Sequence, residues 1–357
     1  MRQRPTVYDV AERAGVSIAT VSYTFRQPER VRPTTRDAVL SAARDLGYIP
    51  SGSARGLANG TSGILGLYAF DMLLPSDLTG PLEDADTLVS KELESGGDLR
   101  RFPLYVDEIQ RGFEVEARRL GYSVLLGAGT SKDSIGSIDL AGSVDGLAIF
   151  PGSAEQSLLE HVGRGVPVVV FSIPPSTDTL HHVTVDNRTA MRGLVQHLVK
   201  VHGYEDLAFV GELAAPDIEE RFAAFRDALA ERGMPMPEAP FDDTVLTDDR
   251  LRAVRRAIAE GRVPRVLVCA NDQAALTVID VLSAHNVRVP QDVAVTGFDG
   301  IVAGRTSDPS LTTVRQPFVS MGRLAVRILT ETADGETAPR SMVLPTRLLV
   351  RRSCGCM

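Results

Sequence analysis

The sequence predicts a small helical domain at the N-terminus, residues 1–50, followed by a large α/β region, residues 62–357. The first residues carry apolar side chains at helical spacing, between residues that commonly cap helices. After Gly60 the pattern changes, and short apolar β-runs alternate with amphipathic stretches. A chain of 357 residues also exceeds what one ordinary hydrophobic core supports. We therefore expect a helical domain, a linker over 51–61, and an α/β region built of two subdomains.

Two short helices joined at a glycine are expected within the first 26 residues. Thr6 is placed to cap the first helix, with Asp9 three residues later to complete a capping box. Gly15 allows a sharp turn because it has no Cβ, and Ser17 is placed to cap the second helix. The apolar residues expected to face inward are Val7, Val10, Ala11, Ala14, Val16 and Val21. Two helices joined in this way form a helix-turn-helix unit, which is typical of DNA-binding proteins.

A third helix completes the N-terminal domain, whose charge differs from that of the remaining chain. The helix is expected to begin near Thr34 or Thr35, after Pro33, and to end at Gly47. The first sixty residues hold nine arginines and five acids, whereas the full chain has a net charge of −8. A basic module on an acidic body favours a polyanionic partner for that module alone. The alternative is a three-helix domain that binds nothing.

The α/β region contains seven apolar runs typical of strands and seven stretches typical of helices. This alternation predicts parallel sheets covered by helices on both faces. The expected strands are 64–69, 123–126, 146–150, 166–171, 207–210, 266–269 and 293–297. The expected helices are about 108–120, 154–163, 188–202, 217–232, 249–260, 273–285 and 317–333. Seven strands and seven helices are more than one compact α/β domain contains. We therefore expect two similar subdomains with a ligand-binding cleft between them.

Composition excludes several kinds of protein. No apolar run approaches the ~20 residues that a membrane span needs, and no apolar signal core follows the N-terminal charges, so a cytoplasmic protein is expected. The three cysteines include Cys354 and Cys356 near the C-terminus, without companions typical of a zinc site. The six histidines show no metal-binding spacing, and the His181-His182 pair is expected in a solvated loop. We therefore expect no metal and no cofactor.

Several segments resemble one known protein family. They are Val7-Tyr8-Asp9-Val10-Ala11, Ala14-Gly15-Val16-Ser17, Thr20-Val21-Ser22, Thr35-Arg36, Ala42-Ala43, Leu46-Gly47-Tyr48-Ile49-Pro50 and Ala54-Arg55-Gly56-Leu57. They are similar to the start of the lactose-repressor/galactose-repressor family of bacterial transcription regulators, and the resemblance continues almost to the C-terminus. It implies a three-helix helix-turn-helix domain, a hinge helix and an effector-binding region with a fold like that of periplasmic sugar-binding proteins.

The resemblance also implies how the effector-binding region is divided. The N-subdomain is expected at about 62–184 plus 317–334, and the C-subdomain at about 186–315 plus 335–350. The acidic segment 71–103 departs from the family, which has a short loop at this place. Because loops of this length are functional or disordered as a rule, we expect a mobile insertion near the cleft mouth or the dimer face. The alternative is an inert surface loop.

By the same resemblance, the second helix contacts DNA in the major groove. Base contacts are expected from Ile18, Ala19 and Tyr23, near the start of that helix. The first two offer apolar contact, for example to a thymine methyl, and the tyrosine offers a hydroxyl. Phosphate contacts are expected from Ser17, Thr20, Ser22 and Arg26. The alternative for Ile18 is that its side chain packs inward.

The hinge segment is expected to contact the minor groove through Arg55 and Leu57. In the family, the counterpart of Leu57 wedges between base pairs and kinks the duplex. Gly52 and Gly56 each disfavour an isolated helix by about 1 kcal/mol, so this segment is expected to become ordered only on DNA and against its dimer mate. The alternative is a plain linker.

The ligand site of the family lies between the subdomains, where carboxyl ends of parallel strands meet. The counterparts here are Phe70, Asp71, Asp186, Arg221, Asn271 and Asp299. Carboxylates, an amide and a guanidinium suit the hydroxyls of a sugar, which both donate and accept hydrogen bonds, and Phe70 is placed to stack on a ring. Two simpler interpretations remain open: Asn271 and Asp272 as a helix cap only, and Arg221 as a surface ion pair.

The favoured function is a homodimeric transcriptional repressor that binds a near-palindromic operator and releases it when a small effector, with a sugar as the expected class, binds. The alternative, which some members of the family follow, is a corepressor that is needed for DNA binding. A solute-binding module of a transporter would fit the α/β region, but the basic N-terminal module and the missing signal sequence disfavour it. An α/β enzyme is disfavoured because the sequence offers no nucleophile or acid–base pair. A nucleotide cradle is equally disfavoured, because Gly127-Ala128-Gly129 lacks a third glycine and a helix start.

Overall fold

The computed structural model divides into two compact units, Met1–Ser62 and Gly63–Met357. It describes residues 5–48, 61–70, 104–129, 134–152, 154–174, 179–244, 251–333 and 338–356. The expected hinge helix and the acidic insertion at 71–103 lie outside these ranges. Among the helices in these ranges, none has the length and apolar character needed to cross a membrane.

The first unit contains three α-helices around a small apolar core. They are α1 (Val7–Ala14), α2 (Ile18–Arg26) and α3 (Pro33–Leu46), with a 3-10 turn over Pro28–Arg30. The expected capping box is confirmed: the Thr6 backbone N–H donates to Asp9 Oδ2 at 2.6 Å, and the Asp9 N–H donates to Thr6 Oγ1 at 3.4 Å. Helix α3 begins at Pro33 itself, because proline fits the first helical position, where no backbone donor is needed.

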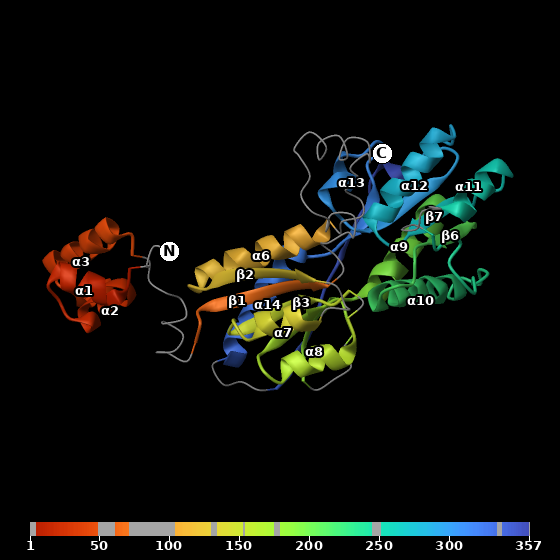
Figure 1. Ribbon diagram of the computed structural model, residues 1–357. Coiled ribbons are helices and arrows are strands. Elements are labelled where there is room, and N and C mark those ends of the chain that lie inside the picture. The colour runs from red at the N-terminus through yellow and green to blue at the C-terminus, as the bar shows by residue number, and fades with distance from the viewer. Residues whose placement is uncertain are drawn as a thin grey trace. The chain divides into compact units, whose positions relative to one another are not determined.

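The second unit contains two sheets, and the first of them is entirely parallel (Figure 1). Its strand order is β10-β5-β4-β3-β1-β2. The strands are β1 (Ile64–Phe70), β2 (Ser123–Gly129), β3 (Gly146–Phe150), β4 (Val168–Phe171), β5 (His181–Val185) and β10 (Ser341–Leu344). The helices around it are α6 (Tyr105–Arg119), α7 (Ser134–Ala141), α8 (Gln156–Gly163) and α14 (Phe318–Ala333).

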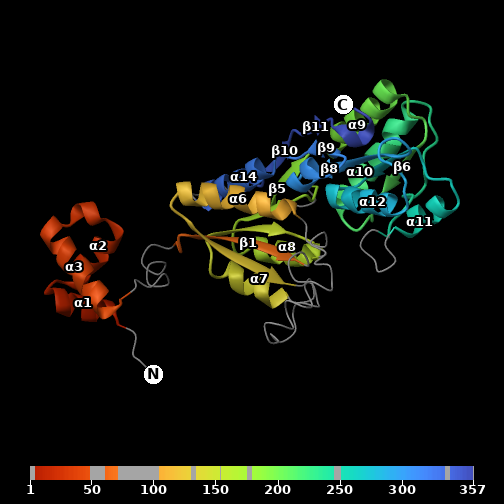
Figure 2. The ribbon, with the colours of Figure 1, turned by 90° about the horizontal axis from the view of Figure 1, so that it is seen from above.

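Alternate residues of β1 pack on opposite faces of this sheet. Leu65 and Leu67 join a core that includes α6 and α14, while Tyr68 and Phe70 join a core that includes α7 and α8. Helices α6 and α14 lie side by side on one face (Figure 2). The predicted parallel sheet covered on both faces is therefore confirmed.

The second sheet has the order β11-β9-β8-β7-β6, and only β11 runs antiparallel. Its strands are β6 (Leu207–Val210), β7 (Val266–Cys269), β8 (Ala294–Asp299), β9 (Thr312–Arg315) and β11 (Arg347–Leu349). The surrounding helices are α9 (Asn187–His202), α10 (Pro216–Ala230), α11 (Arg252–Ala259), α12 (Asp272–Ala284) and α13 (Val302–Thr306). Core residues place α9 and α10 against one face and α11 and α12 against the other.

Two expectations from the sequence are wrong. The His181-His182 pair is not in a solvated loop: both residues lie in β5 and are buried, because His181 accepts the Arg340 N–H at 3.0 Å and His182 contacts the Ile173 carbonyl at 3.1 Å. The segment 335–350 does not belong to the C-subdomain as a whole. Its strand Ser341–Leu344 pairs with β5 of the first sheet, and only Arg347–Leu349 joins the second.

A buried carboxylate connects α6 to α14. Glu116 of α6 accepts hydrogen bonds from Arg119 at 2.8 Å, from Arg327 at 2.7 Å and from Arg323 at 3.0 Å. These hydrogen bonds lower the pKa of Glu116 from 4.5 to about 2, and the bond from Arg119 has the largest effect. Burial acts in the opposite direction, because it raises the pKa. A lowered pKa means that the ionised form stabilises the fold above pH 4.5, and that this stabilisation is lost as the pH falls towards 2.

We expect Glu116→Gln to lower the melting temperature at pH 7, because three guanidinium groups then lose their anionic partner. The difference from the wild type should shrink as the pH is lowered from 5 towards 2, since the wild-type carboxylate then becomes protonated. Thermal unfolding monitored by circular dichroism across this range checks it. A difference that stays constant with pH would contradict the assignment.

Candidate nucleic-acid interface and ligand cleft

The start of α2 presents side chains to solvent. Ser17 caps the helix by accepting the Thr20 N–H at 3.2 Å, and its hydroxyl lies 2.9 Å from the Thr20 hydroxyl. Ala19 is exposed, while Ile18 and Tyr23 are 40% and 50% exposed. The alternative that Ile18 packs inward is therefore wrong, and the three expected base-reading side chains are all accessible.

An open surface pocket with a volume of about 430 Å³ lies beside this helix. It is lined by Thr20, Tyr23, Arg30, Val31, Arg32 and Thr35. Arg30 and Arg32 stand just before the N-terminus of α3, whose unpaired backbone N–H groups also favour an anion. These two arginines were not predicted from the sequence, although their position immediately before a helix start was a usable signal. The surface is suited to a phosphate group.

Several predicted residues lie where the structure gives no side-chain information. Arg55, Leu57 and Asp71 are outside the described residues, and Arg26 is described only as the last residue of α2. Ser22 lies on α2 and is half-buried. The DNA contacts expected of these residues, and the ligand contact expected of Asp71, therefore stay predictions.

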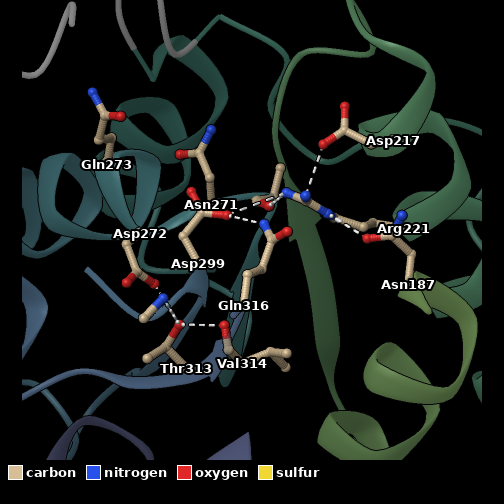
Figure 3. Close-up of polar contacts among 12 residues, drawn as sticks. Asn187, Asp217, Arg221, Asn271, Asp272, Gln273, Asp299, Thr313, Val314 and Gln316 are labelled. Atoms are coloured by element: carbon tan, nitrogen blue, oxygen red, sulfur yellow. Dashed lines mark hydrogen bonds and ion pairs between the residues drawn. The ribbon is translucent and has the colours of Figure 1, made fainter. Parts of the chain in front are cut away.

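Arg221, on α10, is part of a network of polar contacts in the second unit (Figure 3). It is only 3% exposed, so the interpretation as a surface ion pair is wrong. Its Nε donates to Asn187 Oδ1 at 3.0 Å, and its Nη1 donates to the Ala270 carbonyl at 2.8 Å. Its Nη2 donates to Asp217 Oδ2 at 2.7 Å, and its guanidinium lies 4.0 Å from the centre of the Phe298 ring. A planar donor group is thereby fixed in one orientation.

Asp299, at the end of β8, also lies close to the Arg221 guanidinium. Its Oδ1 lies 3.8 Å from Arg221 Nη1 and accepts the Gln316 side-chain N–H at 2.7 Å. Burial raises the pKa of Asp299, an effect that Arg221 opposes. The residue has φ 123°, a backbone conformation that side chains rarely adopt, and such strain is typical of binding sites.

Asn271 and Asp272 form the start of α12, next to Asp299. Asn271 caps the helix by accepting the Ala274 N–H at 2.8 Å, so the predicted cap exists and occupies the amide oxygen. Asp272 is buried, and it accepts the Thr313 hydroxyl at 2.5 Å and the Ile301 N–H at 2.8 Å. Burial raises the pKa of Asp272. Asp272 thus holds α12 against the ends of two strands and keeps Asn271 in place.

A cavity of about 150 Å³ lies where the chain first crosses between the subdomains. Its lining includes Thr184 and Val343 from the first sheet, Asp186 and Asn187 from the crossover, and Asp217, Glu220 and Arg221 from α10. Asp186 also caps α9 by accepting the Thr189 N–H at 2.8 Å. Burial favours a higher pKa of Asp186, but the hydrogen bonds from Thr189 prevail and lower it. The cavity therefore joins groups from both subdomains around one guanidinium.

The first subdomain also contacts this site through the start of α6. Tyr105 stacks on Phe318 with ring centres 5.3 Å apart, and burial together with the charges of Asp217 and Asp299 raises its pKa. The Leu104 N–H donates to Gln273 of α12 at 3.2 Å. Arg315 of β9 forms an ion pair with Glu108 of α6. These contacts connect the two subdomains at the cleft.

The structure brings together Asp186, Arg221, Asn271 and Asp299. Phe70 does not join them with its side chain. The Phe70 side chain is fully buried, and its ring packs on Tyr68 at 4.7 Å within the core against α7 and α8. In this conformation the ring is not available for stacking on a ligand. Tyr105, Asn187, Asp217 and Gln316 were not predicted from the sequence. Asp217 lies one helical turn before Arg221, a spacing that was a usable signal, whereas only the folded chain brings the other three residues to this site.

Comparison with protein-family models and curated proteins gives consistent results. Residues 6–51 match the model of bacterial regulatory proteins of the lacI family, and residues 195–354 match the periplasmic binding protein-like domain. The HTH-type transcriptional regulator CelR of Thermobifida fusca is 30% identical over 365 residues, which cover 99% of each chain. Catabolite control protein A of Priestia megaterium is 29% identical over 358 residues, which cover 98% of each chain.

Solved structures show the same fold over the full chain. A Lac repressor dimer bound to operator and the anti-inducer ONPF matches with TM-score 0.77 and 24% identity, covering 99% of each chain. A complex of the transcriptional regulator CelR with cellobiose matches with TM-score 0.64 and 27% identity, covering 98% of this chain and 100% of that one. These relatives are regulators of transcription and not enzymes. The chain belongs to the lacI family of bacterial regulatory proteins.

Proposed function

We propose that this regulator is a cytoplasmic, homodimeric repressor whose operator affinity is controlled by a sugar bound in the cleft around Arg221. The observation that carries the proposal is the buried guanidinium of Arg221, held between Asn187, Asp217 and Asp299 where the two subdomains meet. A fixed fork of N–H donors beside carboxylate and amide acceptors matches neighbouring hydroxyls of a sugar ring. The solved structure of the related CelR is a complex with a carbohydrate, cellobiose.

The proposed mechanism is a change in the angle between the subdomains. The cleft is bridged on one side by the Glu108–Arg315 ion pair and the Leu104–Gln273 hydrogen bond, and on the other by the crossover at Asp186. A ligand that contacts Arg221 and Tyr105 together favours one of two arrangements, and it shifts DNA affinity only by its different affinity for the two. We expect release of DNA when the sugar binds.

The test is a thermal-shift screen of the purified protein against monosaccharides, disaccharides and nucleosides, followed by operator selection from random duplex DNA. The proposal expects a sugar to raise the melting temperature and to lower affinity for the selected near-palindromic operator. If every sugar leaves both quantities unchanged while a nucleoside changes them, the effector class is wrong. If the protein selects no duplex, the proposed DNA-binding function fails.

Base-reading and phosphate-binding residues of the first unit should give distinct effects on DNA binding. We expect Tyr23→Phe to relax sequence preference at one operator position at a cost of about 1–3 kcal/mol there, because the lost hydroxyl faces a base. We expect Arg32→Gln to weaken binding to all duplexes alike. The slope of the logarithm of the binding constant against the logarithm of the salt concentration should fall in magnitude by about 1. Selection from random DNA and anisotropy at several salt concentrations separate the two; a uniform loss with Tyr23→Phe would contradict its assignment.

A further inference from the structure

Four side chains with the chemistry of zinc ligands converge at the far end of α9, away from the cleft. Their ligand atoms, from His197, His202, Cys354 and Cys356, all lie within 4.8 Å of one another. From the sequence, these cysteines were expected to have no companions and the histidines no metal-binding spacing. That expectation is wrong, because the fold brings together two pairs that are more than 150 positions apart in the chain.

The distances within this group suit a single tetrahedral cation. Cys354 Sγ and Cys356 Sγ lie 3.6 Å and 3.7 Å from His197 Nε2, and Cys356 Sγ lies 3.3 Å from His202 Nε2. With Zn–S near 2.3 Å and Zn–N near 2.0–2.1 Å, an ideal tetrahedron places sulfur and nitrogen about 3.6 Å apart. The three sulfur–nitrogen separations given above therefore lie within a few tenths of an ångström of the ideal value.

The backbone around the group holds its ligands in place. His202 is the last residue of α9, and its ring stacks on Tyr204 with ring centres 5.2 Å apart. The Tyr204 hydroxyl donates to the Cys354 carbonyl at 3.0 Å. Gly355 has φ 103°, which allows the chain to turn so that the cysteines on either side of it face the same point.

The segment that carries the cysteines is fixed to the second sheet. Ser353 accepts the Thr312 N–H at 2.8 Å and donates to the Val295 carbonyl at 2.6 Å. The Thr312 hydroxyl lies 3.1 Å from Cys354 Sγ, where it is placed to donate a hydrogen bond to a thiolate. Cys354 is buried, whereas Cys356 lines an open groove that gives an ion a route to the group.

We propose that His197, His202, Cys354 and Cys356 bind a structural Zn²⁺ ion. Two thiolates and two neutral imidazoles form a Cys₂His₂ set, and the four protein ligands leave no open coordination position for a substrate. The His-x₄-His spacing is usual for zinc, while the Cys-x-Cys spacing is shorter than usual and is made possible by Gly355. The ion would fasten residues 352–356 to α9 and stabilise the second subdomain.

The direct test uses the full-length protein, purified under reducing conditions without a histidine tag. We expect elemental analysis to find stoichiometric zinc, and chelation to lower the melting temperature until Zn²⁺ is restored. We expect Co²⁺ added to the metal-free protein to give the thiolate-to-cobalt charge-transfer absorption of a tetrahedral site. A metal-free protein that gives no such absorption with Co²⁺ overturns the proposal, as does a Cys354–Cys356 disulfide in the reduced preparation.

Matched variants identify the ligands. Cys356→Ser and His202→Asn should each lose the stoichiometric zinc and the cobalt charge-transfer absorption. Cys269→Ala, at a buried cysteine of β7, and His161→Asn, at an exposed histidine of α8, should keep both. Retention of the absorption in Cys356→Ser overturns the assignment. The cobalt titration of the wild type decides the proposal by itself if a variant fails to fold.

Discussion

Arg221→Lys is expected to remove the response to the effector while leaving DNA binding intact. The guanidinium makes three directed hydrogen bonds, to Asn187, the Ala270 carbonyl and Asp217, and the single ammonium of lysine cannot span these acceptors. A hydrogen bond to a charged group contributes about 1.5–3 kcal/mol, so the loss of two such bonds from the guanidinium to the ligand lowers ligand affinity about 100-fold or more. Calorimetric titration with the ligand found in the screen measures the effect.

The matched control is Arg288→Lys, the same substitution at an arginine that is 70% exposed and paired with Asp292. Because exposed ion pairs contribute about 0–1 kcal/mol, this variant should bind ligand and DNA as the wild type does. Retention of wild-type ligand affinity in Arg221→Lys would remove Arg221 from the binding site. Retained affinity together with an altered melting temperature would assign it a purely structural role.

Gly322→Ala is expected to destabilise the second unit strongly. Helices α6 and α14 approach so closely that a Cβ on Gly322 would lie 2.0 Å from the Ile109 carbonyl oxygen, and one on Gly112 would lie 2.1 Å from the Val319 carbonyl oxygen. These contacts are with backbone, so the helices must separate. Overpacking of this kind costs about 3 kcal/mol, at the upper end of the usual range, and lowers the melting temperature by about 5–10 °C.

Gly193→Ala is the control for this prediction, because Gly193 also lies inside a helix, α9, but has no atom within 4 Å of its added Cβ. It should stabilise the protein by up to about 1 kcal/mol, since alanine favours a helix over glycine. Chemical denaturation of both variants gives the two free energies of unfolding. Equal effects would contradict the close approach of α6 and α14.

The first unit was predictable because local signals determine its elements. The Thr6–Asp9 capping box, the Ser17 cap and the left-handed Gly15 and Gly47 are each formed by residues within a few positions of one another. Strand β5 was missed because its histidines are polar, and nothing local shows that partners such as the Arg340 N–H satisfy them in the interior. The pairing of β10 with the first sheet was missed for a similar reason, because the strands that β10 and β11 pair with are distant in the chain.

The cleft was predictable in part. Asn271 and Asp299 follow apolar strands, where parallel sheets place ligand sites, and the family resemblance supplied Asp186 and Arg221. Tyr105 and Gln316 reach the same place only because the start of α6 contacts α12 and because Gln316, just after β9, lies beside Asp299. The four-residue Cys/His group was missed because its histidines and its cysteines are more than 150 positions apart in the chain.

The central claim is that one ligand, bound around Arg221, changes the DNA affinity of the helix-turn-helix unit. The most direct measurement is reciprocal: operator affinity by fluorescence anisotropy with and without saturating ligand, and ligand affinity by calorimetry with and without saturating operator. The account predicts that both affinities fall by the same factor, about 5–150-fold, because coupling between two sites is symmetric. A ligand that binds the cleft with unchanged affinity whether or not operator is present, and leaves operator affinity unchanged, would contradict it.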